Sequence, residues 1–395
     1  MVSEFTHIED CNLQFLSFVR FCLSDEKDVP ADVAKIDWEE LLNFAKKHAI
    51  VGVVARTLLH DRRLANSDFC LRNRPSEEQV MDWMSLMVKI DQDNRKCNEV
   101  AAWTIRNFKK TGFDACILKG QGANLFYPTR TDRMPGDVDV WVRPKQSATS
   151  QNETVDVLIQ QSKDVEQVLE ECRKVMPKAK ACYHHVEFVT KHNIPIEVHY
   201  RPQWLSNPWH NRNLQRYFMN HADEQFKHHC VLPDGKALVV PTAEFNVIFM
   251  LSHIYNHLMH EGIGVRQLID YFYLLKSVRW SDTLRSQLQN VMSDCGLLNI
   301  GQGVSWMMVE VLGLDKAHII VTPSEHYGRE LLREVLAGGN FGKHDERTLS
   351  GVYQSPIMAN LQRFVRDFRL LFYFPSESLW EPFFRVYYFF WRKRH

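Results

Sequence analysis

The 395-residue sequence lacks the patterns of disulfide-stabilised, zinc-ribbon and membrane-spanning proteins. Its nine cysteines are scattered and include no C-x-x-C pair, so neither a disulfide framework nor a structural zinc site is indicated. No window free of charged residues is long enough to cross a bilayer. The N-terminal stretch carries acidic residues where a signal peptide would have a basic region and an apolar run. These absences predict a cytoplasmic protein with reduced thiols.

The sequence also lacks an excess of charge of either sign. Lys and Arg total 48, and Asp and Glu total 48, so the formal net charge is zero. A net charge of zero does not indicate a nucleic acid as partner, although a local basic patch is compatible with it. The composition, 45% hydrophobic and 24% charged, is that of an ordinary globular protein, and the length allows two or three domains. The oligomeric state stays open.

The pattern of apolar residues divides the chain into three regions. Residues 1–110 are predicted to be helical, because 38–60 and 77–110 carry apolar residues at helical spacing. Residues 241–395 are predicted to be a helical C-terminal domain. Between them, 111–240 is predicted to be a small core that contains strands. The fold class is therefore α+β, a small mixed sheet flanked by N- and C-terminal helical regions.

The predicted core alternates short apolar runs with polar segments. Residues 145–161 are rich in polar side chains and predict a loop, and 162–175 predict a helix capped by Ser162. The expected strands lie within 113–120, 136–144, 182–192 and 194–202, the last two joined by a tight turn. At the other end of the chain, 383–395 is aromatic and then basic. It predicts a terminal helix whose rings pack on the body, and contact with a membrane surface is the alternative.

The stretch GDVDVWVRP (136–144) combines a strand pattern with two acidic residues. Val138, Val140 and Val142 alternate with Asp137, Asp139 and Trp141, so the two carboxylates share one face of the strand. Carboxylates held side by side repel each other and are costly to bury. A divalent cation with a preference for oxygen ligands removes that cost. An edge strand with a hydrated face is the alternative interpretation.

A third carboxylate follows on a later predicted strand. Glu197 and His199 are two residues apart and therefore share a face of that strand. Three carboxylates from neighbouring strands can hold two metal ions for in-line phosphoryl chemistry. Upstream, Lys119 and Gly120 stand at a strand-to-helix turn, where a glycine lets a phosphate approach the backbone and a helix start offers free N–H groups.

The order of these motifs resembles the nucleotidyltransferase superfamily of the DNA polymerase β type. More closely, the stretches 117–144, 196–202 and 253–275 resemble the uncharacterised bacterial nucleotidyltransferase family, whose members carry LKG, R-x-x-GDxD, E-x-H and RQ-x-x-D in this order. The resemblance extends over residues from about 40 to 280. The chain departs from the superfamily pattern in having Lys119–Gly120 in place of G-G or G-S.

The resemblance implies a five-stranded type of mixed sheet, dependence on Mg²⁺ or Mn²⁺, and transfer of a nucleoside monophosphate from an NTP such as ATP to an unknown acceptor. Carried over position by position, it assigns catalysis and metal binding to Asp137, Asp139 and Glu197, and nucleotide binding to Lys119, Gly120, Arg133 and Gly136. Further candidates for contacts to nucleotide or acceptor are Arg130, His199, His253, Arg266 and Asp270.

Several of these residues have a second interpretation. Arg133 can be a surface arginine paired with its neighbour Asp132, and Arg266 and Asp270, four residues apart, can form an ion pair along one helix. His199 either orients Glu197 or packs within the sheet. His184 and His185 precede a strand, and one of them must face the sheet surface near Glu197.

Two other functions compete with nucleotidyl transfer. One is a regulatory module that binds a nucleotide on the same fold without turnover. The other is a metal-dependent phosphohydrolase that uses His253 and His257, which have the i,i+4 spacing of a helical zinc pair. The presence of all three carboxylates favours the active transferase.

Overall fold

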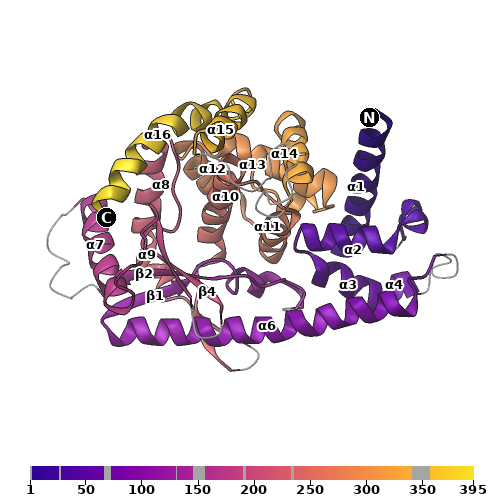
Figure 1. Ribbon diagram of the computed structural model, residues 1–395, viewed down its shortest axis with the longest axis horizontal. Coiled ribbons are helices and arrows are strands. Elements are labelled where there is room, and N and C mark those ends of the chain that lie inside the picture. The colour runs from indigo at the N-terminus through magenta and orange to yellow at the C-terminus, as the bar shows by residue number, and fades with distance from the viewer. Residues whose placement is uncertain are drawn as a thin grey trace.

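The computed structural model describes residues 2–25, 28–65, 73–129, 131–145, 156–189, 193–232, 235–339 and 356–395. Within them a four-stranded mixed sheet lies among helices (Figure 1), in the order β1 (Phe113–Ile117), β2 (Val138–Pro144), β4 (Pro195–His199) and β3 (His185–Val189). β2 runs parallel to β4 and antiparallel to β1, and β3 and β4 form the predicted antiparallel pair. The α+β prediction is confirmed.

The described sheet has four strands where the resemblance implied five. β5 (His229–Val231) and β6 (Ala237–Val239) pair only with each other, as a separate two-stranded sheet. Each has only three residues, so these two strands form a short hairpin and not a fifth strand of the main sheet.

The two faces of the sheet carry different chemistry, as the alternation in 136–144 predicts. Val138, Val140 and Val142 are buried in an apolar cluster with side chains of α6 (Glu77–Lys110) and α7 (Val157–Val175). Asp139 and Trp141 point to the opposite face, where Trp141 stacks on Phe245 of α10 (Ala243–His260) with ring centroids 5.7 Å apart. The polar face of β2 is therefore buried beneath a helix and does not face solvent.

Helix α6 ties the sheet to the N-terminal helices. Its N-cap is Ser76, whose side chain and that of Gln79 accept hydrogen bonds from each other's backbone N–H groups, and it ends at Lys110. Its 34 residues make a rod about 50 Å long at 1.5 Å per residue. Figure 1 shows this rod running beneath both the sheet and the N-terminal helices, which are α1 (Val2–Leu23), α2 (Trp38–Lys47), α3 (Val51–His60) and α4 (Arg62–Ala65).

The remaining helices follow the predicted order, with one correction. Helix α7 begins at Val157 with Asp156 as its cap, five residues before the predicted start. Ser162 is therefore inside the helix, where its hydroxyl donates to the carbonyl of Leu158, one turn back. The other helices are α8 (Pro208–Asn220), α9 (Ala222–Gln225), α11 (Val265–Ser277), α12 (Asp282–Asp294), α13 (Leu298–Trp306), α14 (Glu325–Gly338), α15 (Pro356–Leu370) and α16 (Pro375–Arg394).

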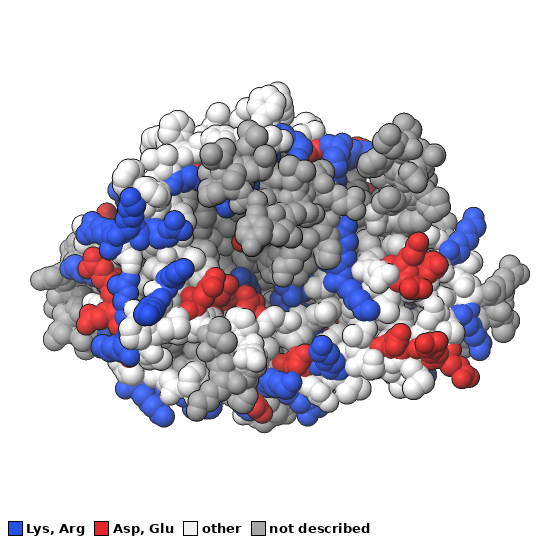
Figure 2. Space-filling model, viewed as in Figure 1, with Lys and Arg blue, Asp and Glu red and all other residues white. Residues whose placement is uncertain are grey.

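None of the described helices is long and apolar enough to cross a membrane. Charged side chains of both signs are interspersed over the face in Figure 2, and the described residues of that face form no continuous basic stripe. The domain boundaries at 110 and 240 stay predictions. One apolar cluster joins N-terminal residues such as Phe18 to C-terminal residues such as Phe249, so the two helical regions share a core.

The last helix, α16, has two apolar faces. On the inner face Phe384 stacks on Trp204 with centroids 4.0 Å apart, and Phe384 and Trp391 are buried. This is the packing on the body that the sequence predicts. On the outer face Phe383 and Phe390 are exposed, each to more than 60%. The predicted packing therefore accounts for half of the aromatic residues of this helix.

A buried ion pair fastens α16 to α10, and it makes the stability of this contact depend on pH. Glu381 Oε2 lies 2.9 Å from His260 Nε2. Burial opposes ionisation, but His260, Ser206 and Arg385 together lower the pKa of Glu381 from 4.5 to about 2. Burial likewise opposes the charge on His260, and Glu381 raises the pKa of that imidazole above 6.5.

We expect the melting temperature of wild type to exceed that of Glu381→Gln most between about pH 4.5 and 6.5, where both partners are charged. The Glu381 contribution is lost as the pH falls from 4.5 towards 2, and the His260 contribution is lost as the pH rises through the raised pKa of the imidazole. Thermal melts of both proteins across this range measure the difference. A difference that does not change with pH would contradict the assignment.

A glycine in α3 positions the segment that precedes β2. A Cβ atom added to Gly52 would lie 2.2 Å from the carbonyl oxygen of Asp132 and 2.7 Å from its carbon. Both are backbone atoms, so a side chain at this position must push the segment away from α3. We expect Gly52→Ala to lower the free energy of unfolding by about 1–3 kcal/mol. Gly338→Ala in α14 is the matched control, since its Cβ would meet only Gly262 at 3.8 Å. Urea denaturation measures both, and equal effects would contradict the assignment.

Candidate active site

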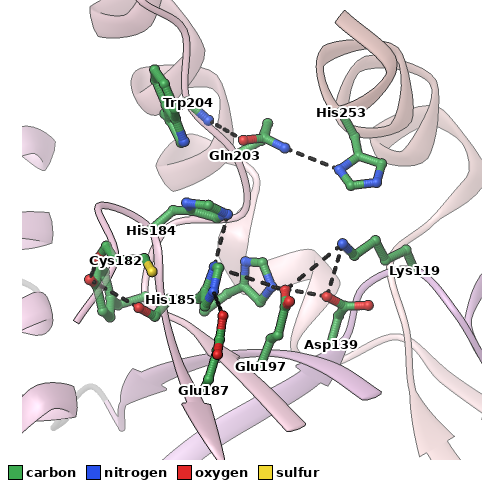
Figure 3. Close-up of polar contacts among 12 residues, drawn as sticks. Lys119, Asp139, Cys182, His184, His185, Glu187, Glu197, Gln203, Trp204 and His253 are labelled. Atoms are coloured by element: carbon green, nitrogen blue, oxygen red, sulfur yellow. Dashed lines mark hydrogen bonds and ion pairs between the residues drawn. The ribbon is translucent and has the colours of Figure 1, made fainter. Parts of the chain in front are cut away.

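The site forms where β2 and β4 run side by side. Asp139 and Glu197 are register partners of these parallel strands, so their side chains point to the same face. His199 binds both, with Nε2 3.1 Å from Asp139 Oδ1 and 3.2 Å from Glu197 Oε2. Asp139 is fully buried. Figure 3 shows the two carboxylates meeting above the sheet, as the sequence predicts for this pair.

Lys119 supplies a positive charge between these carboxylates. It follows β1, and its Nζ lies 3.1 Å from Asp139 Oδ1 and 4.0 Å from Glu197 Oε2 (Figure 3). Burial opposes the charge of Lys119, yet the nearby carboxylates raise the pKa of its ammonium above the usual range. Burial likewise opposes ionisation of Glu197, but Lys119 and His199 hold the pKa of this carboxyl well below the usual range. The site is therefore a compact network of opposite charges.

Gly120 allows the backbone to come close to the acidic residues. Its φ is +59°, a conformation that side chains rarely adopt. A Cβ atom here would lie 3.2 Å from the carbonyl oxygen of Asp137 and 4.0 Å from Asp139 Oδ2. Asp139 Oδ2 is buried, and it has no hydrogen-bond partner among the described residues. The turn at Gly120 thus faces a carboxylate oxygen that is free to bind a ligand.

Asp137 lies at the rim of the site. It immediately precedes β2, which begins at Val138, and it lines the same small cavity as Lys119, Gly120 and Asp139. Among the described residues, the groups of three or more ligand atoms within 4.8 Å of one another include Asp139, Glu197 and His199 but not Asp137. Its predicted pairing with Asp139 at a metal stays a prediction. Gly136 is exposed, and a Cβ atom there would lie 3.9 Å from Arg266 Nη1.

The structure corrects the alternative interpretations of Arg133, Arg266 and Asp270. Arg133 is buried and not on the surface, and its Nε and Nη2 donate to Asp270 at 2.8 and 2.9 Å. Asp132 instead contacts Arg56, 2.6 Å from its Nε. Asp270 therefore pairs across the fold with Arg133, while Arg266 donates to the carbonyl of Met134 at 3.3 Å. Arg130, another candidate, lies outside the described residues.

Helix α10 covers the site with a chain of imidazoles. His253 lines the small cavity, and its Nε2 lies 3.0 Å from His257 Nε2. Nδ1 of His257 lies 3.1 Å from Glu261, one turn further along the helix. Burial lowers the pKa of His253 well below its usual value, so this imidazole is neutral. The predicted i,i+4 pair is therefore together in space, but the described residues place no third metal ligand beside it.

Some residues of the site carried no signal in the sequence. Gln203 binds His253 Nδ1 at 3.1 Å from the loop after β4, and the hydroxyl of Tyr127 donates to Asp270 at 2.7 Å. Gln203 belongs to no periodic pattern or motif, whereas Tyr127 belongs to the stretch 117–144 that resembles the family, without a predicted role of its own. They are found only once the loops that carry them are placed.

The cavity above the carboxylates is small. Its volume is about 20 Å³, room for about one water molecule. It is lined by Asp139 of β2, by residues of the segments before β2, by Met250, His253 and Ile254 of α10, and by polar residues of α11. A much larger cavity of about 800 Å³ lies on the opposite face of the sheet, against Trp103, Val175 and Ile196. That cavity is mostly apolar and does not contain the acidic residues, so the chemistry belongs to the smaller one.

Comparison with known proteins identifies the family of this chain. No curated protein matches. One solved structure, described as the crystal structure of an antigenic nucleotidyltransferase-like protein from Paracoccidioides brasiliensis, matches with a TM-score of 0.29 and 12% identity, over 59% of this chain and 96% of the other. A family model described as uncharacterised nucleotidyltransferase matches residues 34–313, which include every predicted site residue. The chain belongs to this nucleotidyltransferase family.

Proposed function

We propose that the protein transfers a nucleoside monophosphate from an NTP such as ATP to an acceptor hydroxyl, in a reaction that requires Mg²⁺. The observation that carries the proposal is the meeting of Asp139 and Glu197 in register on neighbouring strands, opposite the turn at Gly120. Buried carboxylates on a sheet and a phosphate-accepting turn are the parts that metal-assisted phosphoryl chemistry needs. Family membership supports the same reaction class.

The residues present fit a hard divalent cation. In the part of the chain that the structure describes, Asp139 Oδ2 is a buried oxygen with no hydrogen-bond partner. The ammonium of Lys119 lies between Asp139 and Glu197, where a cation is favourable. Asp137, Asp139 and Glu197 would hold Mg²⁺, or Mn²⁺, which accepts the same oxygen ligands. When bound, the ion would neutralise phosphate charge and lower the pKa of the attacking hydroxyl.

Lys119 is the residue that must change partners for the reaction. The cavity of about 20 Å³ does not accommodate a nucleoside triphosphate, so α10 and the sheet must separate, and Lys119 then turns from the carboxylates to the phosphates. Glu197 thereby loses the cation that most lowers its pKa in this structure, and its carboxylate becomes available to the metal and to the acceptor. His199, whose Nε2 lies 3.2 Å from Glu197 Oε2, packs against that carboxylate and keeps it beside Asp139.

The chemical step forms one bond to phosphorus and breaks another. The acceptor oxygen forms a bond to the α-phosphorus, the bond from that phosphorus to the α,β-bridging oxygen breaks, and pyrophosphate leaves with the electron pair. Glu197 receives the proton of the acceptor hydroxyl. Arg133 is bound to Asp270 and therefore acts by holding the segment before β2. Arg266, whose Nη1 lies 3.9 Å from a Cβ atom built on Gly136, would be the guanidinium that contacts a phosphate there.

Labelled nucleotides test the proposal. Purified protein is incubated with Mg²⁺, a lysate of cells that express the chain, and each NTP labelled at either the α- or the γ-phosphate. Nucleotidyl transfer puts α-label on an acceptor and releases γ-label as pyrophosphate. Release of γ-label as inorganic phosphate would indicate a phosphohydrolase, and α-label that stays in NTP would contradict turnover.

One observation favours the second candidate, a regulatory nucleotide-binding module. Lys119 already neutralises Asp139 and Glu197, so the fold can hold these acidic groups together without a metal. Such a module would bind NTP with equal affinity in the presence of Mg²⁺ or a chelator. Isothermal titration under both conditions separates the two functions.

A further inference from the structure

Three histidines gather beside the carboxylates. Figure 3 shows two of them, His184 and His185, on the side of Glu197 away from Lys119. His185 and His199 are register partners of β3 and β4, and their ring centroids lie 5.2 Å apart. His184 precedes β3, and its ring meets both of the others, at 4.3 Å from His185 and 5.2 Å from His199. One ring nitrogen from each of the three lies within 4.8 Å of the other two.

The inward nitrogens of this histidine cluster share one carboxylate. His184 Nε2 lies 2.9 Å from His185 Nδ1, and that atom lies 3.9 Å from Glu197 Oε2. His199 Nε2 lies 3.2 Å from the same oxygen. The three imidazole nitrogens therefore form one group, and Glu197 Oε2 lies beside two of them. Three nitrogens with an oxygen as fourth ligand are the donor set of a tetrahedral zinc-type site.

We propose that His184, His185, His199 and Glu197 bind one divalent transition-metal ion of the zinc type, separate from the hard cation proposed at Asp137 and Asp139. Imidazole nitrogens prefer Zn²⁺ and its neighbours in the transition series, whereas carboxylate and water oxygens suit Mg²⁺. Glu197 lies between the two sets, and a carboxylate has two oxygens with which to serve both. The site does not depend on nucleotide transfer.

The surroundings of the histidine cluster suit metal binding. His185 and His199 are buried. Burial is also the main cause that lowers the pKa of His184 well below its usual value, so this ring is in the neutral form that metals bind. The outer nitrogen of His185 faces Glu187 Oε1 at 3.6 Å. A carboxylate behind a ligating histidine fixes its tautomer and orientation in many metal sites. Glu187 is exposed, so this outer carboxylate lies at the solvent-facing side of the cluster.

A second set of possible ligands competes for the same ion. Cys182, Glu187 and His185 also offer ligand atoms within 4.8 Å of one another, and His185 belongs to both sets. The two sets differ in chemistry, because the second contains a thiolate and the first contains only nitrogen and oxygen. A metal with a visible spectrum therefore distinguishes them.

Cobalt binding to the full-length protein tests the proposal without using activity. Metal-free wild type is titrated with Co²⁺ and should bind one ion per chain with the visible bands of four-coordinate nitrogen and oxygen ligation. His184→Gln and His185→Gln should each bind at least about 100-fold more weakly, because losing a ligand costs more than the roughly 10–100-fold that loss of an outer-shell partner costs. His229→Gln, an exposed histidine of β5, is the matched control and should bind as wild type does.

Three results would overturn the proposal. The first is that wild type takes up no Co²⁺, and the second is that both histidine variants keep the spectrum and affinity of wild type. The third is a thiolate-to-cobalt band in wild type that Cys182→Ser removes. Circular dichroism of each variant shows whether it folds. Competition in wild type needs no variant: Zn²⁺ should displace bound Co²⁺, and Mg²⁺ should not. Failure of nucleotide transfer leaves these results unchanged.

Discussion

Asp139→Asn is expected to lower the rate of nucleotidyl transfer by about a thousand-fold or more. Asp139 is fully buried, it is hydrogen-bonded to His199, and its Oδ2 is free for a ligand. The asparagine keeps the shape of the side chain but replaces one anionic oxygen with a hydrogen-bond donor, so a cation bound there loses its charge partner. A single group that stabilises charge in a transition state is worth about 10²–10³-fold in rate, and a buried metal ligand acts on both binding and chemistry.

Pyrophosphate release and Mg²⁺-dependent NTP binding measure this effect separately. Asp114→Asn is the matched control, because Asp114 belongs to the neighbouring strand β1 but pairs in register with Arg143, near the far end of β2. Asp114 is half-buried and outside the site, and we expect the variant to retain activity within a factor of about two to three. Equal rates for wild type and Asp139→Asn would remove this carboxylate from the mechanism.

Much of the site follows from local pattern. The period-two alternation of 136–144 predicts which face of β2 carries Asp139, and the E-x-H spacing predicts that Glu197 and His199 share a face. The parallel pairing of β2 with β4 then brings Asp139 beside Glu197. These predictions succeed because each depends on the geometry of a single strand and on one pairing between strands.

The partners of buried charges are not local and could not be predicted. Asp270 has Arg266 one turn away on its own helix, and i,i+4 spacing suggests that pair. It binds Arg133 instead, 137 residues away, because α11 packs across the segment before β2. Likewise His184 lies outside the regular part of β3, so strand alternation does not apply to it and its ring can meet that of His185. Tertiary packing therefore determines both the partner of Asp270 and the contact between His184 and His185.

Removing the carboxylate of Asp270 is expected to destabilise the protein more than any other single change proposed for this region. Arg133 is only 5% exposed, and two of its nitrogens donate to Asp270 at 2.8 and 2.9 Å. Asp270→Ala leaves that guanidinium buried without its counter-charge, and it also leaves the hydroxyl of Tyr127 without an acceptor. Breaking a buried ion pair in this way costs about 3–5 kcal/mol of unfolding free energy.

Urea denaturation measures this loss, and two further variants show its origin. Asp91→Ala removes an aspartate of α6 from an exposed i,i+4 pair with Arg95, 2.9 Å away, and should cost no more than about 1 kcal/mol. Arg133→Met combined with Asp270→Leu removes both charges and should recover most of the stability lost in Asp270→Ala, because two apolar side chains leave no unpaired charge. If the double variant is as unstable as Asp270→Ala, the ion pair is not the cause. The segment before β2 is then held by its packing on α3 at Gly52, where the backbone of Asp132 lies against the helix.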